Sequence, residues 1–256
     1  MHNHSDSHHP YVKEITEALV REYGRPTLGN KRNPLDEMLY IILSSRTPPD
    51  NYQGTYLALK RKFPRADSLA NCSPGEIAEA IEQGGLQNKK ANTIAAIAAR
   101  LKETFGRVTL ASLHKMETQE AEDFLVSLPG VGKKTARCVL MYALDRPVFP
   151  VDRHCFRVAE RLGWLPKGAQ LADRTADVLQ EGIPAPLRRD LHVGMVILGR
   201  KHCFAQNPNC DTCPLLAFCP TSCLRSDEVC APSKAPAWSA IPDQVSRCMK
   251  GIGAPE

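Results

Sequence analysis

The sequence contains no run of about 18 apolar residues, the shortest stretch that spans a membrane as a helix. Residues 1–10 also lack the apolar core of a secretory signal. We therefore expect no membrane association and a cytoplasmic place of action, at the nucleoid if the source is bacterial. The four histidines of this stretch resemble a metal-binding tract, but a disordered polar tail over 1–10 is the preferred interpretation.

Strand-like alternation of apolar and polar residues is nearly absent, and no repeat of fixed period is present. Apolar residues instead recur at helical spacing over the first 200 residues. Asn33-Pro34 is a helix start signal, because proline suits the first helical position. Further helices are predicted over 11–23, 52–63, 75–83, 88–104, 118–127, 133–144, 153–162, 171–181 and 187–199.

The length of 256 residues allows one large domain or two small ones, and 43% apolar residues are enough for a packed core. A net charge of +5 favours an anionic partner such as nucleic acid, although a plain soluble surface has similar charge. After Cys219 the chain is weakly patterned and interrupted by prolines, which predicts a loose extension over 221–256.

Ten cysteines are unevenly distributed, with four of them within 17 residues at Cys203, Cys210, Cys213 and Cys219. A disulfide framework suits small secreted domains better than this chain. Zinc ribbons pair two C-x2-C knuckles, and this stretch has one. Four thiolates suit either zinc or a [4Fe–4S] cluster, so the residues alone leave both open. Outside the pattern, free thiols are the preferred interpretation of Cys223, Cys230 and Cys248.

A glycine turn, Gly130-Val131-Gly132, precedes the helix that opens at Lys133. The first N–H groups of a helix have no intrahelical partner, and glycines would let a phosphate approach them closely. A turn that needs glycine for its φ angles explains the same residues. Lys134 lies nearly opposite the apolar stripe of its helix, and Lys133 lies closer to the edge of that stripe. Both amines are compatible with a cleft or with bulk solvent.

Asp152 stands just before the helix predicted over 153–162. It suits an ordinary N-cap, but a carboxylate held at a helix start can also face positive charge that develops on a sugar. His154, Arg157 and Arg161 share one face of this helix, which fits either phosphate contacts or a solvated basic face.

The stretches Leu128–Ala136, Pro150–His154 and Arg157-Val158 resemble the helix-hairpin-helix (HhH-GPD) DNA glycosylase superfamily, and within it endonuclease III. The resemblance extends over about residues 11–219. It implies an all-α, two-lobed fold: a helical barrel domain over 34–146, and a cluster domain made of 11–33 plus 147–220. It also implies that the four-cysteine loop holds a [4Fe–4S] cluster.

By the same resemblance Lys134 is the catalytic amine and Asp152 its carboxylate partner. The superfamily's adenine glycosylase branch has no lysine at this position, so Lys134 bears on the type of reaction. An attacking amine must be neutral, and we expect the neighbouring cation Lys133 and a closed cleft to ease loss of its proton.

Duplex contacts follow from the resemblance as well. Leu86 is expected to intercalate beside Gln87, although a leucine that anchors its loop to the core is the alternative. Lys89 and Lys90 open the next helix, where they can touch phosphate. Arg46 replaces the family's usual glutamine, and we expect it to contact the orphaned strand or a phosphate. The remaining expected contacts are Gly130, Val131, Gly132, Lys133 and His154.

The predicted activity is bifunctional: excision of oxidised or damaged pyrimidines, then cleavage of the strand at the abasic site. The expected partner is double-stranded DNA with a damaged base or an abasic site, bound by a monomer. Two alternatives stay open. One is a glycosylase for another lesion or mismatch with weak lyase activity, and the other is a non-catalytic, cluster-bearing DNA-binding protein.

Overall fold

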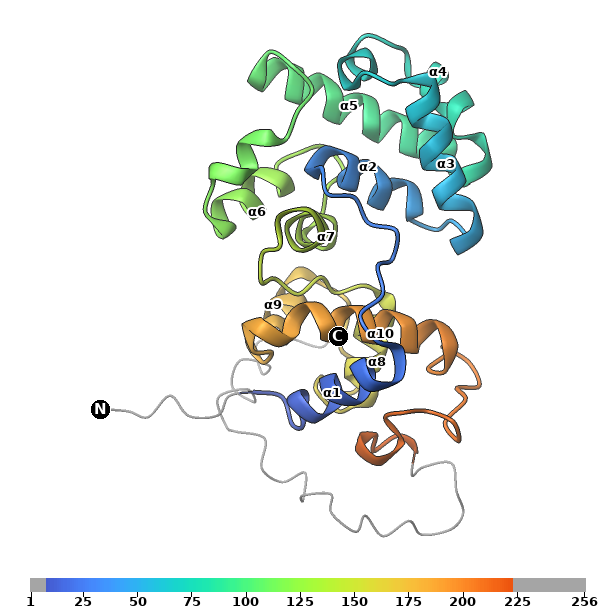
Figure 1. Cartoon of the computed structure of the whole chain (residues 1–256), viewed down its shortest axis with the longest axis vertical. Coiled ribbons are helices and arrows are strands. Elements are labelled where there is room, and N and C mark those ends of the chain that lie inside the picture. The colour runs from blue at the N-terminus through green and yellow to red at the C-terminus, as the bar shows by residue number, and fades with distance from the viewer. Residues whose placement is uncertain (1–7, 223–256) are drawn as a thin grey trace, which may run out of the picture.

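The computed structural model describes residues 8–222, which contain ten α-helices, short 3₁₀ turns and no strand (Figure 1). The helices are α1 (Val12–Tyr23), α2 (Pro34–Ser44), α3 (Pro49–Lys62), α4 (Pro74–Ala80), α5 (Gln87–Phe105), α6 (Thr118–Val126), α7 (Lys133–Leu144), α8 (Arg153–Arg161), α9 (Asp173–Glu181) and α10 (Arg188–Lys201). Each helix predicted from the sequence is present, with ends shifted by a few residues. No helix in this range is long and apolar enough to cross a membrane. Cys223, Cys230 and Cys248 lie outside the described residues.

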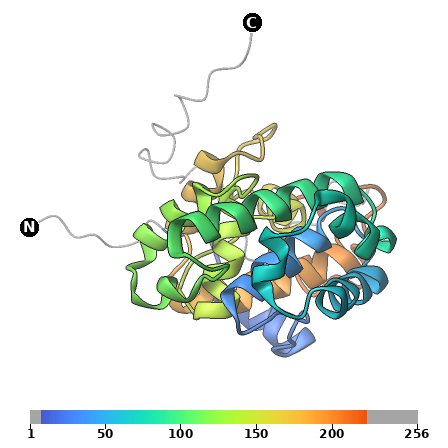
Figure 2. The ribbon, with the colours of Figure 1, turned by 90° about the horizontal axis from the view of Figure 1, so that it is seen from above.

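Two hydrophobic cores divide the described chain into two lobes. The first, here called the barrel lobe, buries α2 to α7 around Met38, Leu43 and Ile94. The second, the cluster lobe, packs α1 and α8 to α10 around Ile15, Phe149 and Leu198. Figure 1 shows the lobes one above the other, and Figure 2 looks onto the barrel lobe with the cluster lobe behind it.

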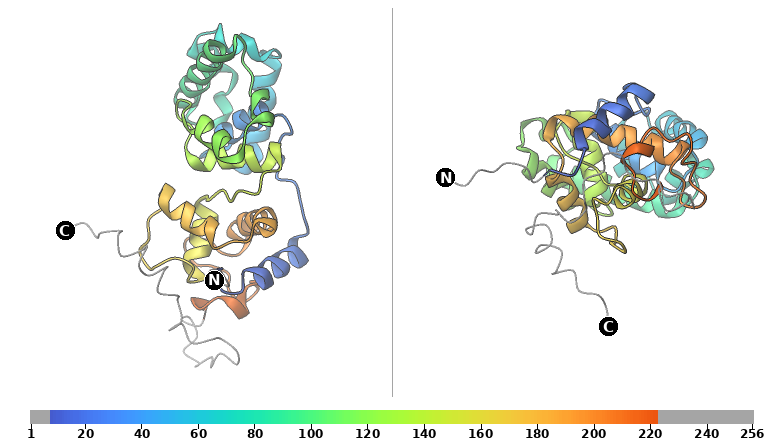
Figure 3. Two further views of the ribbon diagram at one scale, coloured as in Figure 1. Left: turned by 90° about the vertical axis from the view of Figure 1, so that its left-hand side faces the viewer. Right: turned by 90° about the horizontal axis from the view of Figure 1, so that it is seen from below.

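The chain crosses between the lobes at two segments, one between α1 and α2 and one between α7 and α8, as the left view of Figure 3 shows. α1 therefore packs on α10, near the other end of the chain. The prediction of a disordered tail over 1–10 is wrong for its last residues, which are ordered against the cluster lobe. His9 stacks on Trp164, and its ring nitrogen Nε2 contacts the Leu179 carbonyl at 3.2 Å.

α2 forms the centre of the barrel lobe, and its sequence explains why. Asn33 caps it by accepting bonds from the N–H groups of Leu35 and Asp36, and Pro34 occupies the first turn, where no N–H is needed. Nearly every later side chain is apolar, because α3, α5 and α7 surround the helix. This burial fixes the C-terminal end of α2, where Arg46 follows.

A buried ion-pair group joins the barrel lobe to α9 of the cluster lobe. The Arg137 guanidinium of α7 contacts Glu122 of α6 at 3.0 Å and also bonds Asp177 of α9. Lys133 donates to the second oxygen of Asp177 at 2.8 Å. Arg137 and Glu122 are only 4% and 5% exposed, so breaking the pair would leave a buried charge uncompensated. The group thereby sets how the start of α7 faces the second lobe.

Candidate active site and cluster loop

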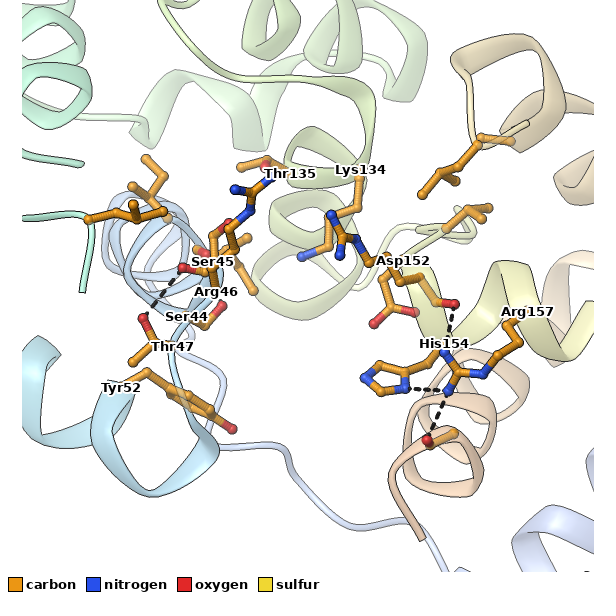
Figure 4. A pocket seen from close by; sticks show the side chains of 18 of the residues that line it. Ser44, Ser45, Arg46, Thr47, Tyr52, Lys134, Thr135, Asp152, His154 and Arg157 are labelled. Atoms are coloured by element: carbon orange, nitrogen blue, oxygen red, sulfur yellow. Dashed lines mark hydrogen bonds between the residues drawn. The ribbon is translucent and has the colours of Figure 1, made fainter. Parts of the chain in front are cut away.

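A cavity of about 1240 Å³ opens between the two lobes, and residues from both form its walls (Figure 4). The barrel lobe contributes the segment after α2, the turn before α5 and the first turn of α7. The cluster lobe contributes the start of α8, the segment before α9 and the end of α10. Of the residues predicted to act, the lining includes Arg46, Leu86, Gly130, Lys134, Asp152 and His154.

Lys134 is the second residue of α7, and its half-buried side chain reaches the cavity between the Arg46 wall and Asp152 (Figure 4). Burial disfavours the ammonium ion, but the neighbouring Cys138, Asp152, Cys155 and Glu37 outweigh burial and hold the pKa of Lys134 above its ordinary value. Burial also raises the pKa of the Cys138 thiol to about 11, so Asp152 is the ionised neighbour near neutral pH.

Lys133 is not among the groups that shift the pKa of Lys134 in the protein without DNA, so the expected effect of this neighbouring cation stays a prediction. Lys133 points away from the cavity toward Asp177, and the groups that face Lys134 are acidic or neutral. Two adjacent lysines thus differ in what their amines contact: one binds an ion-pair partner of the other lobe, and one faces the cavity.

Asp152 combines the two roles that its sequence position allowed. It is the N-cap of α8, where its Oδ1 accepts a bond from the Cys155 N–H at 2.8 Å. Burial would raise the pKa of its carboxyl, but His192, that backbone N–H and Lys134 outweigh burial and lower it. Asp152 is consequently an anion beside the Lys134 amine across a wide pH range.

The glycine turn leaves part of its backbone open. Gly130 has a φ of 72°, and a Cβ there would come within 3.0 Å of Thr93. No side chain caps α7, so the N–H groups of its first turn face outward from the exposed N-cap Gly132. Val131 differs from the two glycines, because its side chain is buried and its N–H donates to the Leu128 carbonyl. Its side chain is therefore part of the core and not a DNA contact.

Two exposed side chains stand on the barrel-lobe wall, each on left-handed backbone. Arg46 follows α2 with a φ of 52°, and Leu86 caps α5 with the same φ. Leu86 is 46% exposed, which removes the alternative of a leucine buried as a loop anchor. Gln87 is half-buried at the first position of α5 and does not line the cavity. Lys90 is buried, contrary to the expectation of a phosphate contact.

The basic face of α8 holds the cluster loop. Arg157 donates to the carbonyls of Cys203 and Gly199 at 2.8 and 2.9 Å, and to Nδ1 of His154 at 3.1 Å. Arg161 donates to the Phe204 carbonyl at 2.8 Å and to the Cys203 Sγ at 3.1 Å. Both interpretations of this face, phosphate contact and solvated surface, are thus wrong for the two arginines. Burial lowers the pKa of His154, which keeps its ring neutral at the cavity edge.

The four cysteines of the loop fit an iron-sulfur cluster better than a single metal ion. They are half-buried free thiols that influence one another's charge, and burial raises the pKa of Cys213 to about 11. No three metal-ligating side chains of the described residues converge as they would on one ion. In a [4Fe–4S] cluster each thiolate binds a different iron, which places the sulfurs farther apart. The Arg161 contact supplies positive charge beside one of these thiols.

Several residues that the sequence did not single out lie in the site or directly behind it. Glu37 is fully buried in α2, where Asn30 Nδ2 and the Lys31 N–H hold its carboxylate at 2.5 and 2.6 Å, and burial raises its pKa. Leu171 and Phe204 line the cavity while 46% and 41% exposed. An acidic residue in an apolar helix was the one signal in the sequence that pointed to any of them.

An all-α, two-lobed protein with a lysine and a carboxylate in the cleft and a four-cysteine loop belongs to the class of DNA glycosylases. The HhH-GPD superfamily of base excision DNA repair proteins matches residues 39–185, more than half of the chain, and the chain belongs to this superfamily. The iron-sulfur binding domain of endonuclease III matches residues 203–219, so the loop is a [4Fe–4S] site.

Relatives and solved structures agree with this assignment. A protein of Arabidopsis thaliana named "Putative DNA glycosylase" is 37% identical over 193 residues, covering 72% of this chain and 66% of that protein. Endonuclease III of Thermotoga maritima is 29% identical over 81% of this chain and 92% of its own length. A trapped covalent endonuclease III–DNA intermediate matches with a TM-score of 0.71 at 27% identity, over 84% and 96% of the two chains. The chain is an endonuclease III-like glycosylase.

Proposed function

We propose that this protein is a bifunctional glycosylase and abasic-site lyase, which removes oxidised or damaged pyrimidines from duplex DNA through the Lys134 amine. The observation that carries the proposal is the placement of Lys134 and Asp152 on facing walls of one cavity, beside an open glycine turn. DNA binding alone needs neither the amine nor the carboxylate, which disfavours a non-catalytic DNA-binding protein. The proposed ligand is a DNA duplex with a damaged base or an abasic site, bound by a monomer in the cytoplasm.

The proposed reaction begins when the neutral Lys134 nitrogen attacks C1′ of an extruded nucleotide. The new C–N bond replaces the glycosidic bond, and the base leaves with that electron pair and takes up a proton. Opening of the sugar ring gives a Schiff base. Loss of a proton from C2′ then breaks the C–O bond on the 3′ side. Asp152 is suited to stabilise the positive charge that develops on the sugar, because its carboxyl stays ionised.

The cluster has no step in this reaction. Cys203, Cys210, Cys213 and Cys219 would hold it, and when bound it supplies a fixed point for the loop between α10 and residue 222. Phe204 and Ala205, which the same loop contributes to the cavity wall, depend on that fixed point.

Borohydride trapping on abasic-site DNA tests the lyase proposal. A covalent adduct is expected with the wild type and with Lys133→Ala, and no adduct is expected with Lys134→Ala. Asp152→Asn should bind DNA while losing on the order of a hundredfold or more in single-turnover rate. Tight binding to abasic DNA without any adduct in the wild type would contradict the proposal and favour a non-catalytic protein.

Lesion choice needs a separate measurement. A panel of duplexes with oxidised pyrimidines, mismatches and alkylated bases ranks the substrates by single-turnover excision. Faster excision of a mismatched or alkylated base than of every oxidised pyrimidine would favour the alternative, a glycosylase for another lesion.

A further inference from the structure

Lys90 is a buried cation that the reaction leaves unexplained. It is the fourth residue of α5 and is 5% exposed, whereas its neighbour Lys89 is exposed. Burial lowers the pKa of Lys90, and no carboxylate offsets this effect. Charged groups are rarely buried without a counter-ion, because the loss of hydration is costly. Other oxygens must therefore hold the ammonium group.

Three oxygens do so, one for each N–H of the amine. The Nζ atom donates to the Leu43 carbonyl at 2.9 Å, to the Gly84 carbonyl at 2.7 Å and to the Thr47 hydroxyl at 2.6 Å. Thr47 Oγ1 is itself within hydrogen-bond distance of both carbonyls. Leu43 lies in the last turn of α2, where the helix dipole presents partial negative charge that favours a cation.

These bonds fasten together the two loops that bear the exposed side chains of the barrel-lobe wall. Arg46 lies between Leu43 and Thr47, and Leu86 lies two residues after Gly84. Gly84 is seated against Thr55, where a Cβ would approach to 2.7 Å, so the second loop cannot slide inward. The Lys90 amine, which lies buried beneath both loops, therefore sets the spacing between Arg46 and Leu86.

We propose that Lys90 is a positioning residue that holds Arg46 and Leu86 as one rigid unit for entry into the duplex. The inference rests on the proposed function, in which these side chains fill the space left by an extruded nucleotide. A single strand has no opposite strand and leaves no such gap. Loss of Lys90 should accordingly impair action on duplex DNA and spare action on single-stranded DNA.

The test uses the full-length, cluster-loaded protein and two readouts. The first is binding to a duplex with a tetrahydrofuran site, which no amine can cleave, opposite a 2-aminopurine whose fluorescence reports disturbance of the opposite strand. The second is the single-turnover rate of strand cleavage at an abasic site, in duplex and in single-stranded DNA. The tetrahydrofuran arm is independent of catalysis, so it stays informative if the lyase proposal fails.

For Lys90→Met we expect about tenfold weaker binding to the tetrahydrofuran duplex and loss of the fluorescence change. The ratio of duplex to single-strand cleavage should fall at least about fivefold, while single-strand cleavage stays within about twofold of wild type. Lys60→Met is the matched control. Lys60 also fastens a neighbouring element to α2, through Asp36 at 2.9 Å, but at the opposite end of that helix. The Lys60→Met variant should therefore bind the tetrahydrofuran duplex and cleave both DNA forms as the wild type does.

Equal losses on duplex and single-stranded DNA would show a merely structural lysine and overturn the proposal, as would an unchanged tetrahydrofuran complex. If Lys90→Met does not fold, Thr47→Val and Lys90→Arg replace it. Thr47→Val removes one oxygen of the three and should lower the same ratio by about threefold, and Lys90→Arg should keep it within about threefold of wild type. An unchanged ratio in Thr47→Val would then overturn the proposal.

Discussion

The two walls of the cleft differ in what their neighbouring basic side chains contact. On the barrel-lobe wall, Arg46 and Lys89 are exposed, and Arg46 lines the cavity. On the cluster-lobe wall, Arg157 and Arg161 turn inward and hold the backbone of the cysteine loop. Arg153 and Arg200 stay exposed on the cluster-lobe wall and line the cavity, and Lys90 turns inward on the barrel-lobe wall. Each wall therefore offers charge to a partner and also uses charge to hold its own loops. A basic stripe in a sequence is therefore not evidence of phosphate binding until its acceptors are known.

The proposed catalytic pair, Lys134 and Asp152, spans the two walls, and its pH dependence tests that arrangement. The pKa of Lys134 is held above its ordinary value, so its neutral fraction grows tenfold per pH unit, while Asp152 stays ionised. We expect the single-turnover rate of adduct formation to rise about a hundredfold between about pH 6.5 and 8.5.

Asp152→Asn sharpens this prediction. Removing the anion lowers the pKa of Lys134, so a slower reaction should reach its plateau at a lower pH than in the wild type. A wild-type rate that levels off below about pH 7.5 would contradict the raised pKa of the lysine.

Arg161→Met tests whether the inward-turned arginines of the cluster-lobe wall hold the cysteine loop in place. The change leaves the carbonyls of Phe204 and Ala205 without their donors, and we expect a loss of about 2 kcal/mol in the free energy of unfolding, with faster release of iron. Thermal unfolding and iron content measure both effects. Arg153→Met on the same helix is the control, since the Arg153 side chain is exposed. Full iron retention with a weaker salt dependence of DNA binding would instead place Arg161 at the phosphates.

Arg46→Gln tests whether the exposed arginine of the barrel-lobe wall contacts the base opposite the lesion. A guanidinium can donate two bonds to guanine, which the amide of glutamine cannot do. We expect the preference among the four bases opposite the lesion to change by about tenfold. Excision from four duplexes that differ only in that base measures it, and an unchanged preference would reduce Arg46 to a phosphate contact.

Lys89→Gln should have the smallest effect. An exposed lysine at a helix start is suited to one phosphate contact, so affinity should fall about two- to threefold for every sequence, and the slope of log affinity against log salt should drop by about 1. Lys62→Gln, which removes an exposed ion pair with Glu79, serves as the control. Equal salt slopes for the two variants would remove Lys89 from the DNA-binding surface.

The sequence predicted the helices because their periods and caps are local. Asn33-Pro34 is an example, since it needs no knowledge of distant residues. The same holds for Asp152 as an N-cap and for the open glycine turn. The direction of long basic side chains was not predictable, because their acceptors lie far along the chain. Lys90 finds its oxygens at Leu43, and Arg157 finds one at Cys203. Likewise, Lys133 finds its acceptor at Asp177, which lies 44 residues along the chain.

The docking of α1 on α10 has a consequence for biosynthesis. The barrel-lobe core is almost contiguous, from Leu35 to Val148, and can close while the ribosome is still at work. The cluster-lobe core joins Val12 and Ile15 to Leu215, so α1, which is made before the barrel lobe, must wait for nearly the last described segment. The four cysteines span Cys203 to Cys219, so the complete iron site exists only after this segment has been made, which places cofactor insertion late in the maturation of the enzyme.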